Sequence, residues 1–166
     1  ETLRDYARLF IDAAQADDLA QGFLALENNF CGPLMVQTGT AVTLRQWQTM
    51  ETRLCAFGQR NYRFEMGLIR AYSDADQRER LIFETYLEQQ ARHALERCRV
   101  RGSLTAMDDA LAVLDRARTE CVCPEYRTRI EELADDLFRD IGMQLTVSRH
   151  GALHWSRGGF VECIDI

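Results

Sequence analysis

The chain has 166 residues, 46% of them apolar and 28% charged, which suits one domain that buries its own core. Its net charge is −6 and every basic residue is an arginine, so chemistry that needs a Schiff-base or phosphate-loop lysine is excluded. Acidic residues outnumber arginines between positions 104 and 140, which argues against a nucleic-acid partner. The longest uncharged stretch, residues 28–44, is too short and too polar to span a membrane.

Two apolar stripes at helical spacing occupy the first 27 residues. The first stripe predicts a helix over residues 2–14, with an inward face formed by Leu3, Tyr6, Ala7, Phe10 and Ile11. Asp17 or Asp18 can cap a second helix, whose inward face consists of Leu19, Phe23 and Leu26. Residues 28–43 contain several asparagines and glycines and one proline, and they predict a connection.

The clearest helix start in the sequence is at Thr43. Thr43 and Gln46 have the spacing of a capping box, and Val42 and Trp47 occupy the positions of a hydrophobic staple. From Trp47 onward, apolar residues recur every three or four positions. The pattern therefore predicts one helix from Thr43 to about position 72 that packs lengthwise on its neighbours.

Three further helices are predicted in the second half of the chain. Ser73 or Asp74 can cap a helix with a wide apolar face, which Gly102 ends. The next helix follows at once, and its inward face is expected to be Leu104, Met107, Leu111 and Leu114. Pro124 suits the first turn of the last helix, which Gly142 ends. Short connections favour antiparallel neighbours, so the predicted fold class is all-α, an antiparallel bundle of five or six helices.

The hydrophobic period changes after residue 143. Apolar and polar residues then alternate between glycine turns, which predicts a helical domain over residues 1–143 and a short β-like or irregular tail over 144–166. The chain lacks an initiator methionine and its last residues alternate apolar and polar, so we expect it to continue into a larger parent chain. The expected partners are neighbouring domains of that parent, with a homodimer through the C-terminal tail as an alternative.

Motifs that carry known chemistry are absent from the sequence. The phosphate-binding loop, the dinucleotide fingerprint, the nucleophile elbow and the zincin motif do not occur, and none of the six cysteines forms a Cys-x-x-Cys pair. His150 and His154 in a strand would lie about 13 Å apart, too far to share one ion. The prediction is therefore no catalytic residue, no metal and no cofactor. A loop that gathers these histidines with Cys163 or with the Cys121 and Cys123 pair stays open as an alternative.

The candidates for ligand binding lie in the middle of the chain. Asn61 falls on the inward stripe, where its amide needs partners, and a polar core residue that fixes helix register is the alternative interpretation. Arg70, Tyr72, Asp74 and Asp76 gather at the predicted junction of two helices. Guanidinium, carboxylate and aromatic groups together bind sugars and small polar ligands. A solvated corner with ordinary ion pairs is the alternative interpretation of these four.

Two segments carry a resemblance to known proteins. Residues 60–84 and the Arg-Gly-Gly-Phe segment at 157–160 resemble parts of helical regions in large multidomain bacterial proteins that act on carbohydrates. The resemblance covers part of the chain and implies no individual catalytic or binding residue. The sequence as a whole favours a non-catalytic helical accessory or interaction domain of a larger bacterial protein. Two alternatives remain: a helical part of a carbohydrate-active enzyme that flanks or completes its active site, and a helical module that binds a small ligand or metal.

Overall fold

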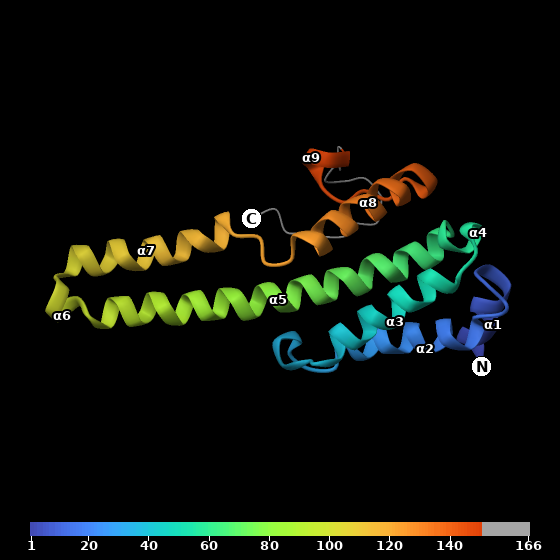
Figure 1. Ribbon diagram of the computed structural model, residues 1–166, viewed down its shortest axis with the longest axis horizontal. Helices are drawn as coiled ribbons and strands as arrows, with labels where there is room; N and C mark the ends of the chain where they lie inside the picture. The colour runs from blue at the N-terminus through green and yellow to red at the C-terminus, as the bar shows by residue number, and fades with distance from the viewer. Residues whose placement is uncertain (151–166) are drawn as a thin grey trace.

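A single long helix organises the molecule. The computed structural model describes residues 1–150, which form helices and their connections without a strand (Figure 1). Helix α5, Tyr62–Glu96, has 35 residues and is therefore about 52 Å long. Every larger helical element packs on α5 or on a helix that does. The predicted all-α class is confirmed for this part of the chain.

The N-terminal helices cover one side of α5, mainly along its first half. They are α1 (Thr2–Phe10), α2 (Ala16–Asn28), the short 3-10 helix η1 (Leu34–Val36), α3 (Gly39–Arg53) and α4 (Ala56–Gln59). Trp47 of α3 is fully buried at the centre of this layer and packs on the Phe23 and Phe64 rings. A Cβ atom at Gly67 of α5 would overlap the Trp47 ring. This glycine lets α3 and α5 approach closely, and it explains why both helices accept such a large side chain between them.

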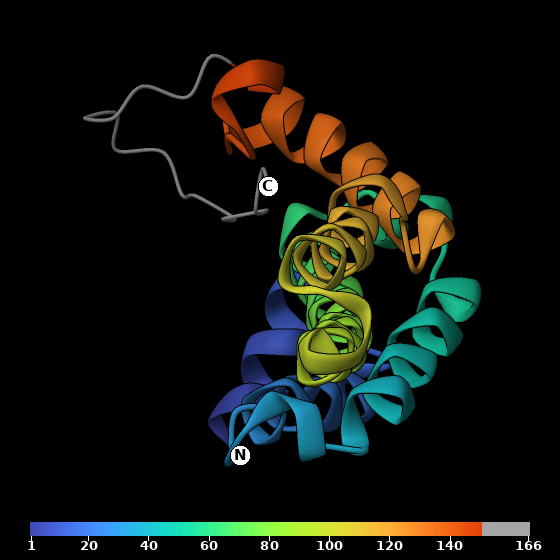
Figure 2. The same ribbon diagram turned by 90° about the vertical axis from the view of Figure 1, so that its left-hand side faces the viewer.

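The C-terminal helices lie on the opposite side of α5, end to end (Figures 1 and 2). After the short α6 (Cys98–Arg101), helix α7 (Ser103–Thr119) runs back antiparallel along the second half of α5. Helix α8 (Pro124–Ile141) continues over the first half, and a single turn, α9 (Val147–His150), follows it. Gly102 and Gly142 have φ angles of +87° and +71°, which glycine adopts without strain. The predicted end at Gly142 is confirmed, whereas the long helix already ends at Glu96 and Gly102 ends the short α6.

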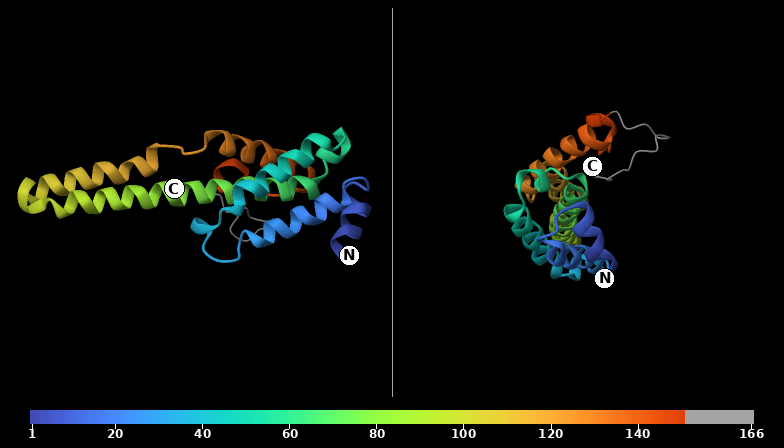
Figure 3. Two further views of the ribbon diagram at one scale, coloured as in Figure 1. Left: turned by 60° about the horizontal axis from the view of Figure 1, so that its bottom comes forward. Right: turned by 90° about the vertical axis from the view of Figure 1, so that its right-hand side faces the viewer.

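The second half of α5 (residues 77–96), α6 and α7 form a helical hairpin that we call the arm. Figure 3 shows that it extends beyond the N-terminal layer, so only two helices are stacked there. The remaining helices and the first half of α5 form the body. The buried apolar residues are Ala106 and Ala110 in α7 and Leu87 and Ala91 in the second half of α5, along which α7 packs. The arm is therefore joined along a narrow seam of mostly small side chains.

Helix α7 contradicts the predicted inward face. The exposed fractions of Leu104, Met107, Leu111 and Leu114 are 76%, 52%, 60% and 43%. The stripe that packs on α5 is the alanine stripe, which lies about 110° away around the helix. Small residues allow two helix axes to approach, and Leu87 of α5 fills the remaining space. The leucine stripe is consequently turned out toward solvent.

The boundaries predicted in the middle of the chain are also wrong. Helix α3 already begins at Gly39 and ends at Arg53, so Thr43 lies inside the helix and the predicted capping box does not form. The Thr43 hydroxyl instead donates a hydrogen bond to the Asn29 side chain at 3.2 Å. The chain is extended at Leu54, whose buried side chain anchors the turn to α4. No helix starts at Ser73 or Asp74, because both residues are buried in mid-α5 and cannot serve as exposed caps.

The predicted β-like tail falls mostly outside the described residues. Residues 147–150 form a helical turn rather than a strand, and 151–166 lie beyond the part of the chain that the structure describes. Within residues 1–150, no helix combines the length and apolar composition that crossing a bilayer requires.

Candidate functional site

The four polar candidates of the predicted junction do not form one site. Arg70, Tyr72, Asp74 and Asp76 all lie in the uninterrupted helix α5. Positions two apart on a helix differ by about 200° in direction, so alternate candidates point to opposite sides. Arg70 and Asp74 lie on the side of the N-terminal layer, and Tyr72 and Asp76 face α8 and the connection before it.

Asp74 is the centre of a buried polar cluster. It is 2% exposed, and its two carboxylate oxygens accept hydrogen bonds from Arg70 Nε at 3.0 Å and from Asn29 Nδ2 at 2.9 Å. Asn29 in turn accepts from Thr43 Oγ1. Burial raises the pKa of Asp74, and the hydrogen bonds from Asn29 and Arg70 oppose that rise. The hydrogen bonds of this cluster connect the end of α2, the start of α3 and the middle of α5. Its role is therefore structural.

Tyr72 and Asp76 lie on the side of α5 that faces α8, and Tyr72 also reaches α3. The Tyr72 hydroxyl accepts a hydrogen bond from Gln48 Nε2 at 3.0 Å, and its ring packs edge-on against Tyr126 of α8. Asp76 lines a small cavity of about 110 Å³ together with Arg80 and Arg127. Burial raises the pKa of Asp76, and the two arginines oppose that rise. A cavity of this size holds a few waters and no larger ligand.

Asn61 is a helix cap, which corrects its predicted place inside a helix. Its Oδ1 accepts from the backbone N–H of Arg63 at 3.0 Å, and its Nδ2 donates to the Phe10 carbonyl at 2.7 Å. The same side chain therefore begins α5 and holds the end of α1 beside it. An asparagine followed by a long helical stripe is a start signal, and the continuous apolar spacing through this position concealed it.

A groove beside this cap was missed by the sequence analysis. It lies between α1, α2 and the start of α5, has a volume of about 550 Å³, and includes Arg63 and Arg70 in its lining. Tyr6, Phe10 and Phe23, which form most of its aromatic wall, were assigned to inward helix faces on helical spacing alone. The signal that could have revealed it is the pair Tyr6 and Phe10, which are 36% and 48% exposed because α1 packs mainly on α2.

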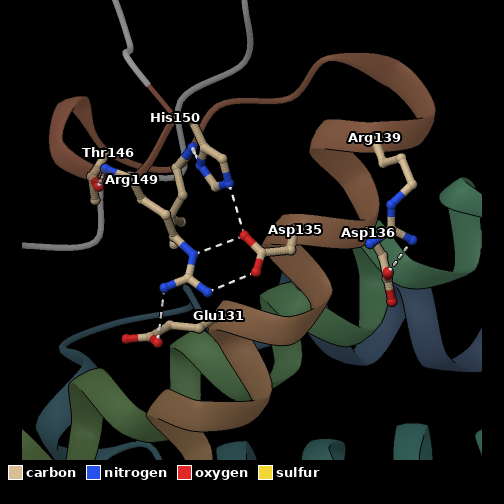
Figure 4. A network of polar contacts seen from close by, with 8 residues as sticks. Glu131, Asp135, Asp136, Arg139, Thr146, Arg149 and His150 are labelled. Carbon is tan, nitrogen blue, oxygen red and sulfur yellow. Dashed lines mark hydrogen bonds and ion pairs between the residues drawn. The ribbon is translucent and has the colours of Figure 1, made fainter.

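A histidine–carboxylate pair lies at the end of the described chain (Figure 4). His150 Nε2 is 3.1 Å from Asp135 Oδ1, and His150 Nδ1 accepts from the Leu145 backbone N–H at 3.0 Å. Because Nδ1 accepts a hydrogen bond, Nε2 carries the ring hydrogen and donates it in a hydrogen bond to Asp135. Neither ring nitrogen is then left to act as a base. Arg149 clamps the same carboxylate with two hydrogen bonds and also pairs with Glu131. The hydrogen bonds and ion pairs of this network attach α9 to α8, which is a structural role.

Metal-ligand clusters and the thiol of Cys123 are further candidates for a site within residues 1–150. No group of three histidine, cysteine or acidic side chains there is placed to hold a metal ion. Cys123 is half-buried, and burial together with the nearby carboxylate of Glu125 raises its pKa to about 11, so it stays a protonated thiol and a poor nucleophile. The alternative of a loop that gathers His150 and His154 with cysteines depends on His154, which lies outside the described residues.

Comparison with known proteins adds no assignment. The chain has no significant match among protein-family models, curated proteins or solved structures.

Proposed function

We propose that this chain is a non-catalytic helical interaction domain, and that the exposed leucine stripe of α7 is its docking surface. The stripe has the 3-4-3 spacing of a coiled-coil seam, with Leu104, Met107, Leu111 and Leu114 between 43% and 76% exposed. An apolar row of this regularity on a solvent-facing helix marks an interaction site. That exposed row is the observation that carries the proposal.

The face extends from α7 onto α5. One flank of the arm brings Tyr86 and His93 of α5 beside Asp109 and Val113 of α7. Helical spacing places Leu81 and Leu95, which are 41% and 44% exposed, on the opposite flank of α5, beside the leucine stripe. The combined face is about 25 Å long and about 20 Å wide, because it spans α7 and the flank of a second helix. Its projected area of about 500 Å² lies toward the low end of what specific interfaces bury per partner, which is typically about 800 Å².

The occupant that fits this face best is the arm of a second copy, packed antiparallel. Two arms joined through their leucine faces complete a four-helix bundle, which the two-helix arm alone lacks. The charges suit that direction. Arg97 and Arg99 at the tip have no ion-pair partner among residues 1–150, and Glu125 in the first turn of α8, next to the other end of the arm, has none there either. An antiparallel pair brings these arginines of each tip toward the partner's Glu125.

The experiment compares mass in solution for matched double variants. Leu104→Ser with Leu111→Ser should convert a dimer to a monomer in light scattering, because two of the three leucines of the stripe leave the interface. Leu9→Ser with Val42→Ser is the control, since these side chains are 75% and 68% exposed but lie outside the arm. A monomeric wild-type chain, or equal loss in both doubles, would overturn the second-copy proposal.

Cross-linking tests the direction of the pair. Cys98 near the tip and Cys121 after α7 are both exposed. A variant that keeps only these two cysteines should form a disulfide-linked dimer on mild oxidation, and variants with either one alone should not. Cross-linking with Cys98 alone would indicate parallel arms and contradict the antiparallel arrangement.

A further inference from the structure

The groove between α1, α2 and α5 has the dimensions of a small-molecule site. Its volume of about 550 Å³ lies in the usual range for ligand pockets, and four aromatic side chains contribute to its lining. They are Tyr6, Phe10, Phe23 and Tyr62. Tyr6 packs on both Phe10 and Phe23, at ring centroid distances of 5.3 and 6.2 Å. These contacts give the groove a continuous aromatic wall that does not depend on a bound molecule.

One end of the groove holds an unpaired cation. The Arg63 guanidinium lies 4.9 Å from the Phe10 ring centroid and 4.3 Å from that of Tyr62. No carboxylate in residues 1–150 lies within ion-pair distance of it. Two rings restrict the motion of this half-buried guanidinium, so little side-chain entropy remains to be lost when an anion pairs with it.

The position of Arg63 is set by the cap described above. Asn61 holds the backbone of Arg63 through one hydrogen bond and the Phe10 carbonyl through another. The cation and its aromatic neighbour therefore keep a fixed separation. Arg63 also lies in the first turn of α5, where the helix dipole favours a negative charge.

The other end of the groove has the opposite character. Arg70 is engaged by Asp74 and lies 4.4 Å from the Phe30 ring centroid, and Glu27 lines the same end. With one arginine and two carboxylates there, this end repels an anion. A bound acid is consequently oriented, with its charge at Arg63 and its apolar part along the aromatic wall toward Met66.

We infer that this groove binds a small amphipathic monocarboxylate with an aryl or branched aliphatic body. The carboxylate pairs with Arg63, and the body lies against Tyr6, Phe10 and Phe23. This site lies on the body and is independent of the docking face on the arm. Failure of either proposal leaves the other standing.

The test uses 3-phenylpropionate as the probe and 3-phenylpropan-1-ol as its uncharged match. In calorimetric or NMR titrations, the acid should bind saturably and about tenfold or more tightly than the alcohol, because only the acid pairs with the guanidinium. Arg63→Gln should abolish that preference. Arg8→Gln, at an exposed arginine of α1 outside the groove, should leave it unchanged.

The outcome against the proposal is equally defined. Equal binding of acid and alcohol, or a preference that survives Arg63→Gln, would overturn the assignment. Saturation-transfer contacts on the wild-type chain keep the test decisive if Arg63→Gln fails to fold. Saturation transfer from the Tyr6 and Phe10 protons to the phenyl ring of the probe is expected. Its absence would contradict binding in this groove.

Discussion

The two halves of α5 share one helix but have different surroundings. In the body, the first half is covered on two sides, by α2 and α3 and by α8, and Phe64, Leu68 and Ile69 are at most 2% exposed. In the arm, the second half packs mainly on α7, apart from a contact between Thr85 and Met35 of η1, and the seam with α7 is mostly alanine. The body is a closed core, whereas the arm leaves its larger apolar side chains outside. The same apolar pattern can therefore serve stability in one half and binding in the other.

The first prediction separates the two halves by stability. Phe64→Ala in the body should lower the free energy of unfolding by about 3–5 kcal/mol, because it removes a fully buried ring and leaves a cavity. Leu111→Ala in the arm should lower it by less than about 1 kcal/mol in the monomer, since that side chain is 60% exposed. Urea unfolding measures both. Similar losses for the two would contradict the division into body and arm.

The second prediction concerns a buried acid at the contact between α5 and α8. Glu65 is 3% exposed, and its Oε2 has no hydrogen-bond partner among the described residues. Burial, with Asp136 and Asp140 nearby, raises the pKa of Glu65 from 4.5 to about 7. The folded chain holds this proton more tightly than the unfolded chain. Its contribution to stability is therefore complete below about pH 4.5 and is lost as the pH rises through 7.

The size of that effect follows from the two pKa values. It is at most about 3 kcal/mol between pH 4.5 and pH 8. Unfolding measured across that interval should show the loss in the wild-type chain and a smaller one in Glu65→Gln, which stays neutral. Glu88→Gln, on the exposed surface of the arm, is the control and should retain the full dependence. An unchanged profile in Glu65→Gln would show that Glu65 titrates normally.

The third and smallest prediction tests how α9 is attached to the body. The hydrogen bonds from Arg149 hold the pKa of Asp135 at about 2. This contribution is present above about pH 4 and is lost as the pH falls toward 2. Because the Asp135 side chain is 46% exposed, Asp135→Asn should cost less than about 1 kcal/mol. It should nevertheless speed hydrogen exchange at the His150 amide, which the α9 turn protects.

Asp136→Asn is the matched control for that change. Asp136 is the next residue of α8 and pairs with Arg139 instead, at 2.9 Å. The His150 amide should exchange at its wild-type rate in this variant. If both variants speed exchange equally, the Arg149 contact is not what holds α9.

Local chemistry accounts for the parts of the fold that were predicted correctly. Gly102 and Gly142 end helices in positive-φ conformations, and Pro124 begins one, as the sequence indicated. Such signals act within one turn and need no tertiary context. The candidate site was less accessible to prediction. Arg70 does line the groove, but Asn61 was placed inside a helix, and Arg63 was not chosen because its importance comes from α1 lying beside it.

The sequence by itself determined that the described chain is all-helical and where several helices end, because caps, glycines and apolar periodicity act over a few residues. Only the tertiary structure decided that α5 continues through Asp74 and that α7 packs on its alanines. Both stripes of α7 have helical spacing, so periodicity cannot choose between them. Close approach of two helix backbones favours the small residues, and that choice leaves the leucines exposed for a partner.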